Sequence, residues 1–463
     1  MATQPTLCGN GFAVSRNLNP TLVDVDTLKP LGRETRKHSP AQIRKVQANI
    51  EQFGFVAAII IDAAGRVIDG WALVLAAKKL GLAEVPAVTI TDLDEANLRL
   101  LRLAVNRLSD DSRWDLERLK LEFSEIMEIG GDIDLRISGF EMGEIDVALE
   151  SCREDEEDDL PALRETAILV TKPGDLWLLG DHLILCADAL MPESYHRLLE
   201  DHRARMIFTD PPFNIPIAGH VSGLGSTKHD DFAMGCGEMS PAEFEGFLRT
   251  TLGHATRCSE DGSIHFVCMH WGKIRELLAA AADLYSETMN LCIWNKSNAG
   301  MGSLYRSKHE LVFAFKKGTA AHINNVQLGR FGRNRSNVWD YPSQNVLNGT
   351  TKSKLSLHPT VKPVALVADA IRDCSNRNDI ILDPFGGAGT TLIAAEKSGR
   401  RARLIEIDPR YVDVTIPRWQ NLTGRTAVRV DAGIGCSDNR ESPIDRSSKI
   451  IIAEARTDDG VDL

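Results

Sequence analysis

The sequence lacks the features of membrane, secreted and zinc-binding proteins. No hydrophobic run is long enough to span a bilayer, and the N-terminus MATQPTLCGNGF lacks the charged and then apolar layout of a signal peptide. The nine cysteines are scattered, odd in number and without any C-x-x-C pair, which argues against a disulfide framework or a zinc site. We therefore expect a cytoplasmic protein with reduced thiols and no bound metal.

The length and charge of the chain indicate several domains separated by a linker. Its 463 residues, 43% of them hydrophobic, can bury substantial cores and suggest two or three domains. The stretch CREDEEDDL, residues 152–160, carries six acidic side chains against one arginine, and a block of like charge is typical of a solvated linker. A domain boundary is therefore expected there.

A net charge of -12 disfavours a nucleic-acid partner, but one segment of the chain is strongly basic. Residues 296–335 contain one acid, Glu310, and eight basic residues: Lys296, Arg306, Lys308, Lys316, Lys317, Arg330, Arg333 and Arg335. A solvated basic face would explain this charge equally well. The aromatic residues Tyr305, Phe331 and Trp339, which are interleaved with the basic ones, favour contact with nucleic acid.

Two parts of the chain show the patterns of different fold classes. Residues 56–90 give two short β runs around an Asp-Ala-Ala-Gly turn, a helix and a further strand, and a longer helix follows over residues 94–108. This pattern predicts a small α+β domain. After the linker, the buried strand RARMIFT (203–209) and the strand, glycine-rich turn, helix and strand of residues 377–412 predict an α/β domain with a largely parallel sheet.

The stretch TDPPFN, residues 209–214, is predicted to form a rigid turn at the end of a strand. Proline fixes φ and donates no backbone hydrogen bond, so Pro211 and Pro212 suit neither a helix interior nor a central strand. Such a turn would hold Asp210 and Phe213 in one geometry.

The glycine-rich turn in ILDPFGGAGTT, residues 381–391, predicts a ligand site. Asp383 ends a strand, the three glycines let the backbone approach a ligand, and Thr390 opens a helix whose N-terminus can receive negative charge. The turn lacks the Lys-Ser/Thr ending of a P-loop. Glu406 ends the next strand about 20 residues later, where an acid typically binds the ribose hydroxyls of a nucleoside. A surface acid at a strand end is the alternative for Glu406.

These motifs resemble those of the S-adenosylmethionine-dependent DNA amino-methyltransferases, which methylate the exocyclic nitrogen of adenine or cytosine. DPPF at residues 210–213 precedes DPFGGAGTT at 383–391, with HPTVKP at 358–363 ahead of the second motif, which is the permuted order of the beta-type enzymes. The resemblance covers about residues 174–423. It implies a Rossmann-like α/β fold with a mostly parallel sheet.

The resemblance also implies a binding site for S-adenosylmethionine. Asp383 would hold the methionine amino group and the glycine turn its carboxylate end, while Glu406 would take the ribose and Asp188 the adenine edge. The full implied set is Asp188, Lys362, Asp383, Phe385, Gly386, Gly387, Gly389, Thr390 and Glu406. A lysine that simply covers a helix start is the alternative for Lys362.

The implied catalytic residues are Asp210, Pro211, Pro212 and Phe213. The lone pair of an exocyclic amine is delocalised into the base ring, so the site must accept hydrogen bonds from the amine protons. Asp210 and the carbonyl of Pro211 can accept them, with the prolines keeping both oxygens aimed at one nitrogen. Phe213 would stack on the base, which must be flipped out of the duplex at a cost of roughly a few kcal/mol.

Two alternatives to the expected reaction stay open at this point. We expect methylation of adenine N6 in double-stranded DNA, because the motif begins with Asp rather than the Ser more usual for cytosine N4, which is the close alternative. The absence of a Pro-Cys dipeptide disfavours a methylase that attacks a ring carbon of cytosine. From another class, the chain could be a ParB-like DNA-binding protein with an inactive methylase domain, which the intact Asp210, Phe213, Asp383 and Glu406 oppose.

The DNA contacts are expected in residues 294–315 and 328–342, where the basic excess lies. The candidate residues are Arg306, Lys308, Arg330, Arg333 and Arg335.

A second resemblance covers residues 20–115. VIDGWALVLAAKKLGLAEVPAV (67–88) and AVNRL (104–108) look like the ParB/sulfiredoxin-like domain that is often fused ahead of such methylases. That family usually has His or Arg soon after the glycine, whereas Gly70 is followed here by Trp71, Ala72 and Leu73. The resemblance therefore implies a DNA-binding or interaction role rather than nuclease or nucleotide hydrolase activity.

Together these features predict five segments. They are an N-terminal extension (1–19), the ParB/sulfiredoxin-like domain (20–115), a helical segment with the acidic linker (116–165), the methyltransferase domain (166–430, with target recognition within 294–357) and a C-terminal tail (431–463). A homodimer is one option for the oligomeric state. A restriction-modification context would imply a partner nuclease, which the sequence does not identify.

Overall fold

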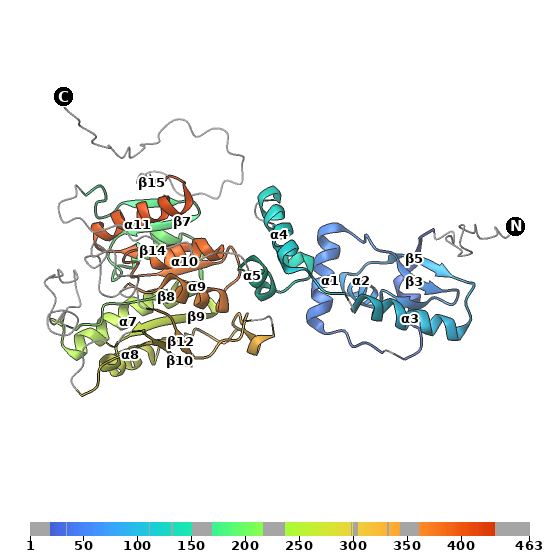
Figure 1. Cartoon of the computed structure of the whole chain (residues 1–463), viewed down its shortest axis with the longest axis horizontal. Helices are drawn as coiled ribbons and strands as arrows, with labels where there is room; N and C mark the ends of the chain where they lie inside the picture. Colours follow the sequence, from blue (N-terminus) through green and yellow to red (C-terminus); the bar gives the residue numbers. More distant parts are fainter. Residues whose placement is uncertain are drawn as a thin grey trace, which may run out of the picture. The chain divides into compact units, whose positions relative to one another are not determined.

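The computed structural model describes residues 19–33, 35–110, 112–130, 133–150, 169–215, 237–297, 299, 304–330, 333–342 and 361–430. Nearly all of the expected N-terminal extension, the acidic linker, residues 343–357 of the expected recognition region and the C-terminal tail lie outside these ranges. The chain divides into two compact units, Met1–Cys152 and Arg153–Leu463 (Figure 1). No helix in the described ranges is long and apolar enough to cross a membrane.

The first unit contains a five-stranded sheet with helices, as its sequence pattern predicts. Its elements are β1 (Thr21–Asp24), β2 (Lys29–Pro30), α1 (Pro40–Phe53), β3 (Ile59–Asp62), β4 (Arg66–Asp69), α2 (Trp71–Leu80), β5 (Glu84–Ile90) and α3 (Glu95–Asp110), with the short 3-10 helix η1 (Val25–Thr27). The strand order is β1-β5-β3-β4-β2. The Asp-Ala-Ala-Gly turn joins β3 to β4, where Asp62 Oδ1 accepts hydrogen bonds from the backbone N–H groups of Ala64 and Arg66.

A small helical segment completes the first unit. It consists of α4 (Leu116–Gly130), the 3-10 helix η2 (Leu135–Ser138) and α5 (Met142–Glu150). Phe123 of α4 packs with Ile145 of α5 in one buried cluster. The Lys45 ammonium of α1 donates a 2.6 Å hydrogen bond to the carbonyl of Gly139, so this segment is anchored to the domain before it.

The second unit is built on a ten-stranded sheet (Figure 1). Its strands are β6 (Leu176–Leu179), β7 (His182–Cys186), β8 (Ala204–Thr209), β9 (Ser259–Met269), β10 (Glu287–Asn295), β11 (His309–Lys316), β12 (Val338–Asp340), β13 (Ile380–Asp383), β14 (Arg401–Glu406) and β15 (Val428–Val430). Its helices are α6 (Pro192–Leu199), α7 (Pro241–Arg257), α8 (Ile274–Ala281), α9 (Val364–Cys374), α10 (Thr390–Ser398) and α11 (Pro409–Thr423), with 3-10 helices η3 (Trp271–Lys273) and η4 (Gln327–Gly329).

The centre of this sheet is parallel and is flanked on both sides by antiparallel pairs, while the edge strand β12 pairs parallel with β10. The strand order is β12-β10-β11-β9-β8-β13-β14-β7-β6-β15. Strands β9, β8, β13, β14 and β7 pair in parallel, whereas β11 pairs antiparallel with both β9 and β10. The sheet therefore has the predicted largely parallel α/β arrangement, and β8 lies beside β13 although about 170 residues separate them in the chain.

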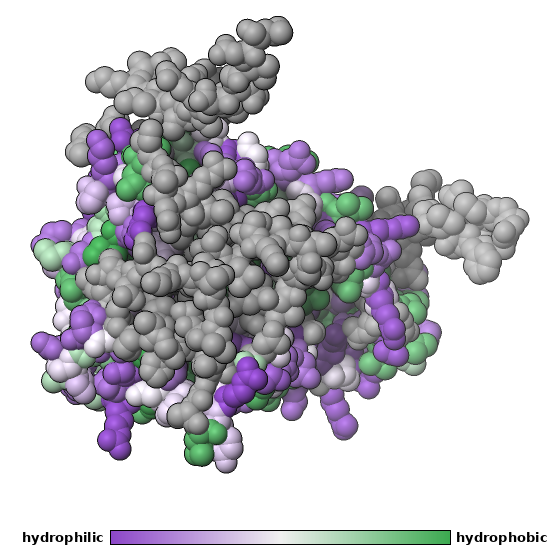
Figure 2. Space-filling view, turned by 60° about the vertical axis from the view of Figure 1, so that its left-hand side comes forward, coloured by the Kyte–Doolittle hydropathy of each residue, from purple (hydrophilic) through white to green (hydrophobic). Residues whose placement is uncertain are grey.

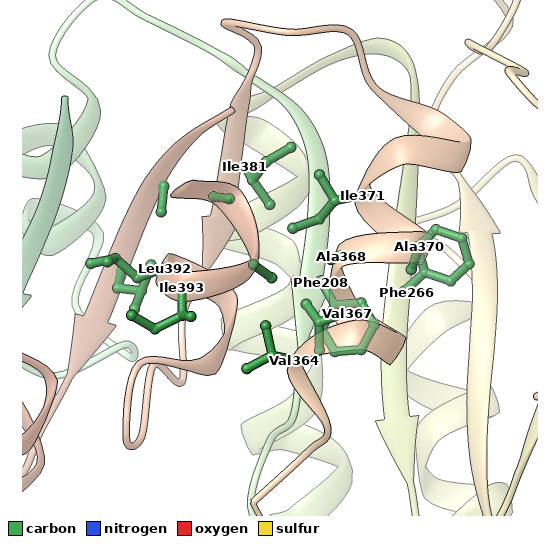
Figure 3. Close-up of a cluster of buried hydrophobic side chains, with 14 of the residues drawn as sticks. Phe208, Phe266, Val364, Val367, Ala368, Ala370, Ile371, Ile381, Leu392 and Ile393 are labelled. Carbon is green, nitrogen blue, oxygen red and sulfur yellow. The ribbon is translucent and has the colours of Figure 1, made fainter. Parts of the chain in front are cut away.

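Alternate residues of the central strands face two different helical layers. On one side Phe208 and Phe266 pack with Val367 of α9 in a buried hydrophobic cluster (Figure 3). On the other side Val267 packs with Phe244 of α7. On the face shown in Figure 2, hydrophilic and hydrophobic side chains are mixed over the described surface, without one large hydrophobic area among the residues drawn in colour. The parallel sheet thus has helices on both sides, which leaves the ends of its strands as the accessible place for a site.

Candidate active site

Four acidic side chains lie where neighbouring parallel strands end. Asp383 and Glu406 are the last residues of β13 and β14, Asp210 directly follows β8, and Asp188 lies two residues after β7. These four strands are adjacent and parallel, so their carboxyl ends lie at one edge of the sheet. The structure therefore brings the four acids that the sequence singled out to the same edge.

The turn after β8 is fixed by its last residue as well as by its prolines. Asn214 has a left-handed backbone, with φ of 52°, and a buried side chain. Its Oδ1 accepts hydrogen bonds from the N–H groups of Gly237 and Met239, and its Nδ2 donates to the carbonyl of Met239. The ring of Phe213 is half-buried, with its centroid 6.5 Å from that of His270. The turn holds Asp210 and Phe213 in place, and Asn214 is a part of it that sequence reasoning gave no role.

The glycine turn after β13 is closed on one side and open on the other. Gly389 has φ of 79°, and a Cβ there would come within 2.4 Å of Thr415, so only glycine fits. Gly387 also has a positive φ, but a Cβ there would meet no atom within 4 Å. Its N–H donates a 2.7 Å hydrogen bond to Glu406 Oε2, and Gly386 N–H donates to the carbonyl of Ile405. The turn is therefore bound to the end of β14 and keeps an open outer side.

Asp383 and Glu406 are buried carboxyl groups. Asp383 Oδ2 accepts a 2.6 Å hydrogen bond from the Thr391 hydroxyl, and Glu406 Oε1 accepts one of 2.9 Å from the N–H of Asp408. Burial nevertheless raises the pKa of Asp383 to about 7 and the pKa of Glu406 to about 7. Within the described ranges, neither acid forms an ion pair with a lysine or arginine. A cation placed beside Asp383 would therefore stabilise its ionised form.

Lys362, which the resemblance implied as a cofactor contact, contacts the acid of the DPPF motif. Its ammonium is 2.6 Å from Asp210 Oδ2 and 2.6 Å from Glu310 Oε1, and its side chain is only 4% exposed. The residue lies two positions before α9, which packs on Phe208 of β8. These contacts lead us to propose that Lys362 acts on Asp210 rather than on the cofactor.

Glu310 and Lys296 belong to the site although sequence reasoning placed neither in it. Glu310 Oε2 is 2.7 Å from the Lys296 ammonium. Burial alone would raise the pKa of Glu310, but Lys362 and Lys296 lower it to about 2. Burial alone would lower the pKa of Lys362, but Asp210 and Glu310 raise it well above its usual value. The only sequence signal was the lone acid of the basic segment, at the start of the hydrophobic run ELVFAF.

The remaining predicted cofactor residues surround the glycine turn and the end of β7. Asp188 is half-buried, and its Oδ1 accepts a 2.8 Å hydrogen bond from the N–H of Leu190. Phe385 packs on Phe247 of α7, with 5.8 Å between the ring centroids. Thr390 is half-buried as the first residue of α10.

The five predicted DNA-contacting residues fall into two groups. Arg306, Lys308 and Arg330 are exposed. Arg333 and Arg335 are not available in the same way, because both guanidinium groups bind acids of α9. Arg333 lies 2.8 Å from Asp373 and 3.2 Å from Asp369. Arg335 lies 2.9 Å from Asp369 and 3.2 Å from Asp373. The side chain of Arg333 is 6% exposed. The expectation that these two arginines contact phosphates is therefore replaced by an internal role in holding residues 333–341 on α9.

This internal role predicts a stability effect without a DNA-binding effect. Arg333→Met should lower the free energy of unfolding of the second unit by about 1.5–3 kcal/mol, because Asp373 loses charged hydrogen bonds in a buried position. Arg330→Met is the matched control at an exposed position, and it should change stability by less than about 0.5 kcal/mol. Urea unfolding and duplex titration of both variants would check this. Reduced duplex affinity in Arg333→Met at unchanged stability would contradict the internal role.

Comparison with known proteins gives two family matches. Residues 204–417 match the N6_N4_Mtase family model, described as a DNA methylase, and residues 117–173 match a ParB-methyltransferase HTH (helix-turn-helix) domain. The second match contains α5 and all of α4 except its first residue.

The similar proteins include two type II methyltransferases. M.ScaI of Streptomyces caespitosus is 38% identical over 97 residues, which cover 20% of this chain and 31% of that protein. M.HinfI of Haemophilus influenzae is 27% identical over 238 residues, which cover 47% of this chain and 63% of that protein. The chain thus spans less than two thirds of the length of either relative. Among solved structures, the cytosine-N4-specific PvuII DNA methyltransferase is 15% identical with a TM-score of 0.40, over 55% of this chain and 88% of that one.

Proposed function

We propose that the chain, which matches a DNA methylase family model and a ParB-methyltransferase HTH domain, transfers a methyl group from S-adenosylmethionine to an exocyclic amine of a base in double-stranded DNA. The observation that carries this proposal is the state of the Asp210 carboxylate. Lys362 holds Oδ2, whereas Oδ1 is buried and has no hydrogen-bond partner among the described residues. A buried oxygen without a donor is costly, so Oδ1 is suited to accept a hydrogen bond from a bound substrate.

The edge formed by Asp383, the glycine turn and Glu406 fits the cofactor. The methionine amino group is a cation, and Asp383 is a buried carboxyl group without a lysine or arginine partner among the residues that the structure describes. Glu406 lies where ribose hydroxyls would bind, and the open side of Gly387 admits a ligand close to the backbone. When bound, the cofactor supplies a methyl group on a positively charged sulfur. We propose that Asp188 borders the adenine, while Phe385, Gly386, Gly389 and Thr390 line the turn.

The residues of the DPPF motif would prepare the amine. Asp210 Oδ1 would accept one amine N–H and the carbonyl of Pro211 the other, which draws the nitrogen lone pair out of conjugation with the ring. When the nitrogen has gained its bond to the methyl carbon it carries an extra proton, which Asp210 is placed to take. Phe213 would stack on the flipped base, and Pro212 keeps the turn rigid.

We propose adenine N6 as the methylated atom, because the motif begins with Asp210 rather than Ser. Cytosine N4 is the second candidate. The known proteins that resemble the chain include a cytosine-N4-specific enzyme, so they do not favour adenine.

A direct experiment separates these outcomes. Plasmid DNA from cells that express the chain would be digested to nucleosides and analysed by mass spectrometry, with single-molecule sequencing of the same DNA to locate the modified sites. N6-methyladenine at one sequence would support the proposal, and N4-methylcytosine would select the second candidate. Unmethylated DNA, together with a purified protein that does not bind S-adenosylmethionine in calorimetry, would instead support a ParB-like DNA-binding protein with an inactive methylase domain.

The charge of the HTH domain bears on where DNA binds. Residues 117–173 contain 17 acidic and six basic side chains, so this segment accounts for nearly the whole net charge of -12. The outward face of α4 exposes Glu122, Glu125 and Glu128. Acidic side chains repel phosphates, which dominate the affinity of proteins for DNA. We propose that the methyltransferase domain at 166–430, with recognition within 294–357, binds the duplex. The ParB/sulfiredoxin-like domain at 20–115 and the HTH domain would then serve interactions with other partners.

Salt-dependent DNA binding tests this division of roles. Replacing Arg306, Lys308 and Arg330 together by Gln should weaken duplex binding and reduce the slope of log affinity against log salt by about one for each phosphate that is no longer neutralised. The matched variant Glu122→Gln, Glu125→Gln, Glu128→Gln should leave the slope unchanged. Titration of one labelled duplex at several salt concentrations would measure both. A clear gain of affinity in the glutamate variant would show that α4 faces DNA.

A further inference from the structure

A chain of four alternating charges links Asp210 to Lys296. Lys362 bridges Asp210 and Glu310 at 2.6 Å each, and Glu310 in turn pairs with Lys296 at 2.7 Å. Lys362 and Glu310 in the middle are 4% and 6% exposed, while Asp210 and Lys296 at the ends are 26% and 27% exposed. Each inner charge therefore has a partner on either side, which is the arrangement that makes buried ions tolerable.

Two aromatic rings enclose the same ammonium group. The Lys362 nitrogen lies 5.6 Å from the ring centroid of Phe213 and 5.9 Å from that of Trp294. Both distances are within the range of a cation–π attraction. The lysine thus contacts both side chains of the DPPF motif that would meet the base, the acid and the aromatic ring.

The hydrophobic core fixes the position of this lysine relative to the acid. Val364, two residues after Lys362, and Phe208, two residues before Asp210, belong to the same buried cluster (Figure 3). Val367 and Ile371 continue this packing along α9. The two ends of the Asp210–Lys362 pair are therefore held by one packed core, although 152 residues separate them in the chain.

We infer that Lys362 is a positioning residue for Asp210. The lysine binds Oδ2 of Asp210 and leaves Oδ1 as the free acceptor for the target amine. Lys362 is itself held in place by Glu310 and Lys296. The inference rests on the proposed methyl transfer, and it gives roles in that reaction to three residues outside the DPPF motif. Without the lysine, Asp210 could rotate about its χ angles and present either oxygen. With it, one oxygen is fixed and the other is kept for the substrate, which is preorganisation of the acceptor.

The same contacts decide the ionisation of Asp210, which must be a carboxylate to accept the amine protons. Burial raises the pKa of Asp210, Lys362 opposes this rise, and Glu310 adds to it. The other ionisable groups near it are Lys296, Asp383 at the end of β13 and the buried thiol of Cys268 on β9. Removing Lys362 should thus favour protonated Asp210, whereas removing the charge of Glu310 should favour the carboxylate.

Two variants therefore shift the pH dependence of the reaction in opposite directions. Lys362→Met removes the positive charge but leaves Glu310 paired with Lys296. We expect up to about 100-fold slower methyl transfer at neutral pH, with the acid limb of the pH–rate profile moved upward by about one pH unit. Glu310→Gln leaves Lys362 paired with Asp210, and the acid limb should move downward. Lys362→Arg keeps the charge and should recover part of the rate.

The rates should be measured in single turnovers with S-adenosylmethionine and duplex DNA both saturating, because cofactor binding has its own pH dependence. Cofactor affinity of each variant, measured by calorimetry, reports both folding and the cofactor site. Unchanged affinity is expected, whereas a large decrease in Lys362→Met would restore the lysine to the cofactor site. Acid limbs that coincide with wild type in both variants would overturn the positioning role. Absence of methylation by the wild-type protein would instead overturn the proposed function itself.

Discussion

Replacing Asp210 with alanine is expected to abolish detectable methyl transfer, a decrease of about 10³-fold or more, while S-adenosylmethionine still binds. The variant removes the acceptor oxygen at the place where positive charge would develop on the amine, and preorganised groups of this kind contribute the largest single effect in many enzymes. The cofactor is proposed to bind Asp383 and Glu406 at the ends of β13 and β14, on neighbouring strands. The single-turnover rate and the calorimetric affinity for the cofactor would be measured on the same preparation.

Two further variants make this result specific. Asp210→Asn keeps the size of the side chain and one acceptor oxygen but removes the charge, so it should retain more activity than Asp210→Ala. Asp201→Ala removes an exposed acid near the start of β8 and should have wild-type activity. Turnover by Asp210→Ala at more than a few per cent of the wild-type rate would remove Asp210 from the proposed mechanism. Loss of cofactor binding in the same variant would show that it disturbs the fold of the site.

The parts of the site that follow strands could be predicted from the sequence. The prolines after Asp210 and the glycines after Asp383 end the β pattern at defined residues. The acid that stands at each of these strand ends indicates a residue of the site. The carboxyl ends of neighbouring parallel strands meet at one edge, so this local information was sufficient to place Asp210, Asp383 and Glu406. Asn214 stands in the same motif, but its partners Gly237 and Met239 are more than 20 residues away in the sequence and could not be predicted.

The charge partners of the site could not be predicted, because they are distant in the chain. Counting charges along residues 296–335 gave a large basic excess, yet Lys296 pairs with Glu310, and Arg333 and Arg335 pair with acids on α9. A linear count includes none of the α9 acids and does not show which charges are buried. The contact of Lys362 with Asp210 was not predicted for the same reason, because it depends on how α9 packs on β8.

The two acids of the cofactor edge make binding and protonation interdependent. In the folded protein, burial raises the pKa of Asp383 and the pKa of Glu406 to about 7 each, well above their ordinary values of 3.8 and 4.5. A carboxyl group with a raised pKa stabilises the folded state at low pH, and this contribution disappears as the pH rises from about 4 through 7. A bound ammonium beside Asp383 would favour the ionised form and lower its pKa again. Cofactor binding below pH 7 should therefore release protons.

The affinity for S-adenosylmethionine is expected to increase strongly between pH 6 and pH 8. If only ionised Asp383 binds the methionine amino group, the dissociation constant should fall about tenfold across this range, and towards 100-fold if Glu406 must ionise as well. Calorimetry at pH 6 in two buffers with different ionisation enthalpies would count the protons released, and titrations at higher pH should show the affinity level off above about pH 8. The Asp383→Asn variant has no ionisable group at this position, so it should bind the cofactor weakly and lose most of the pH dependence. The control variant Asp201→Ala should behave as wild type. An affinity that stays constant from pH 6 to pH 8, with no protons released, would show that the cation of the cofactor does not meet Asp383.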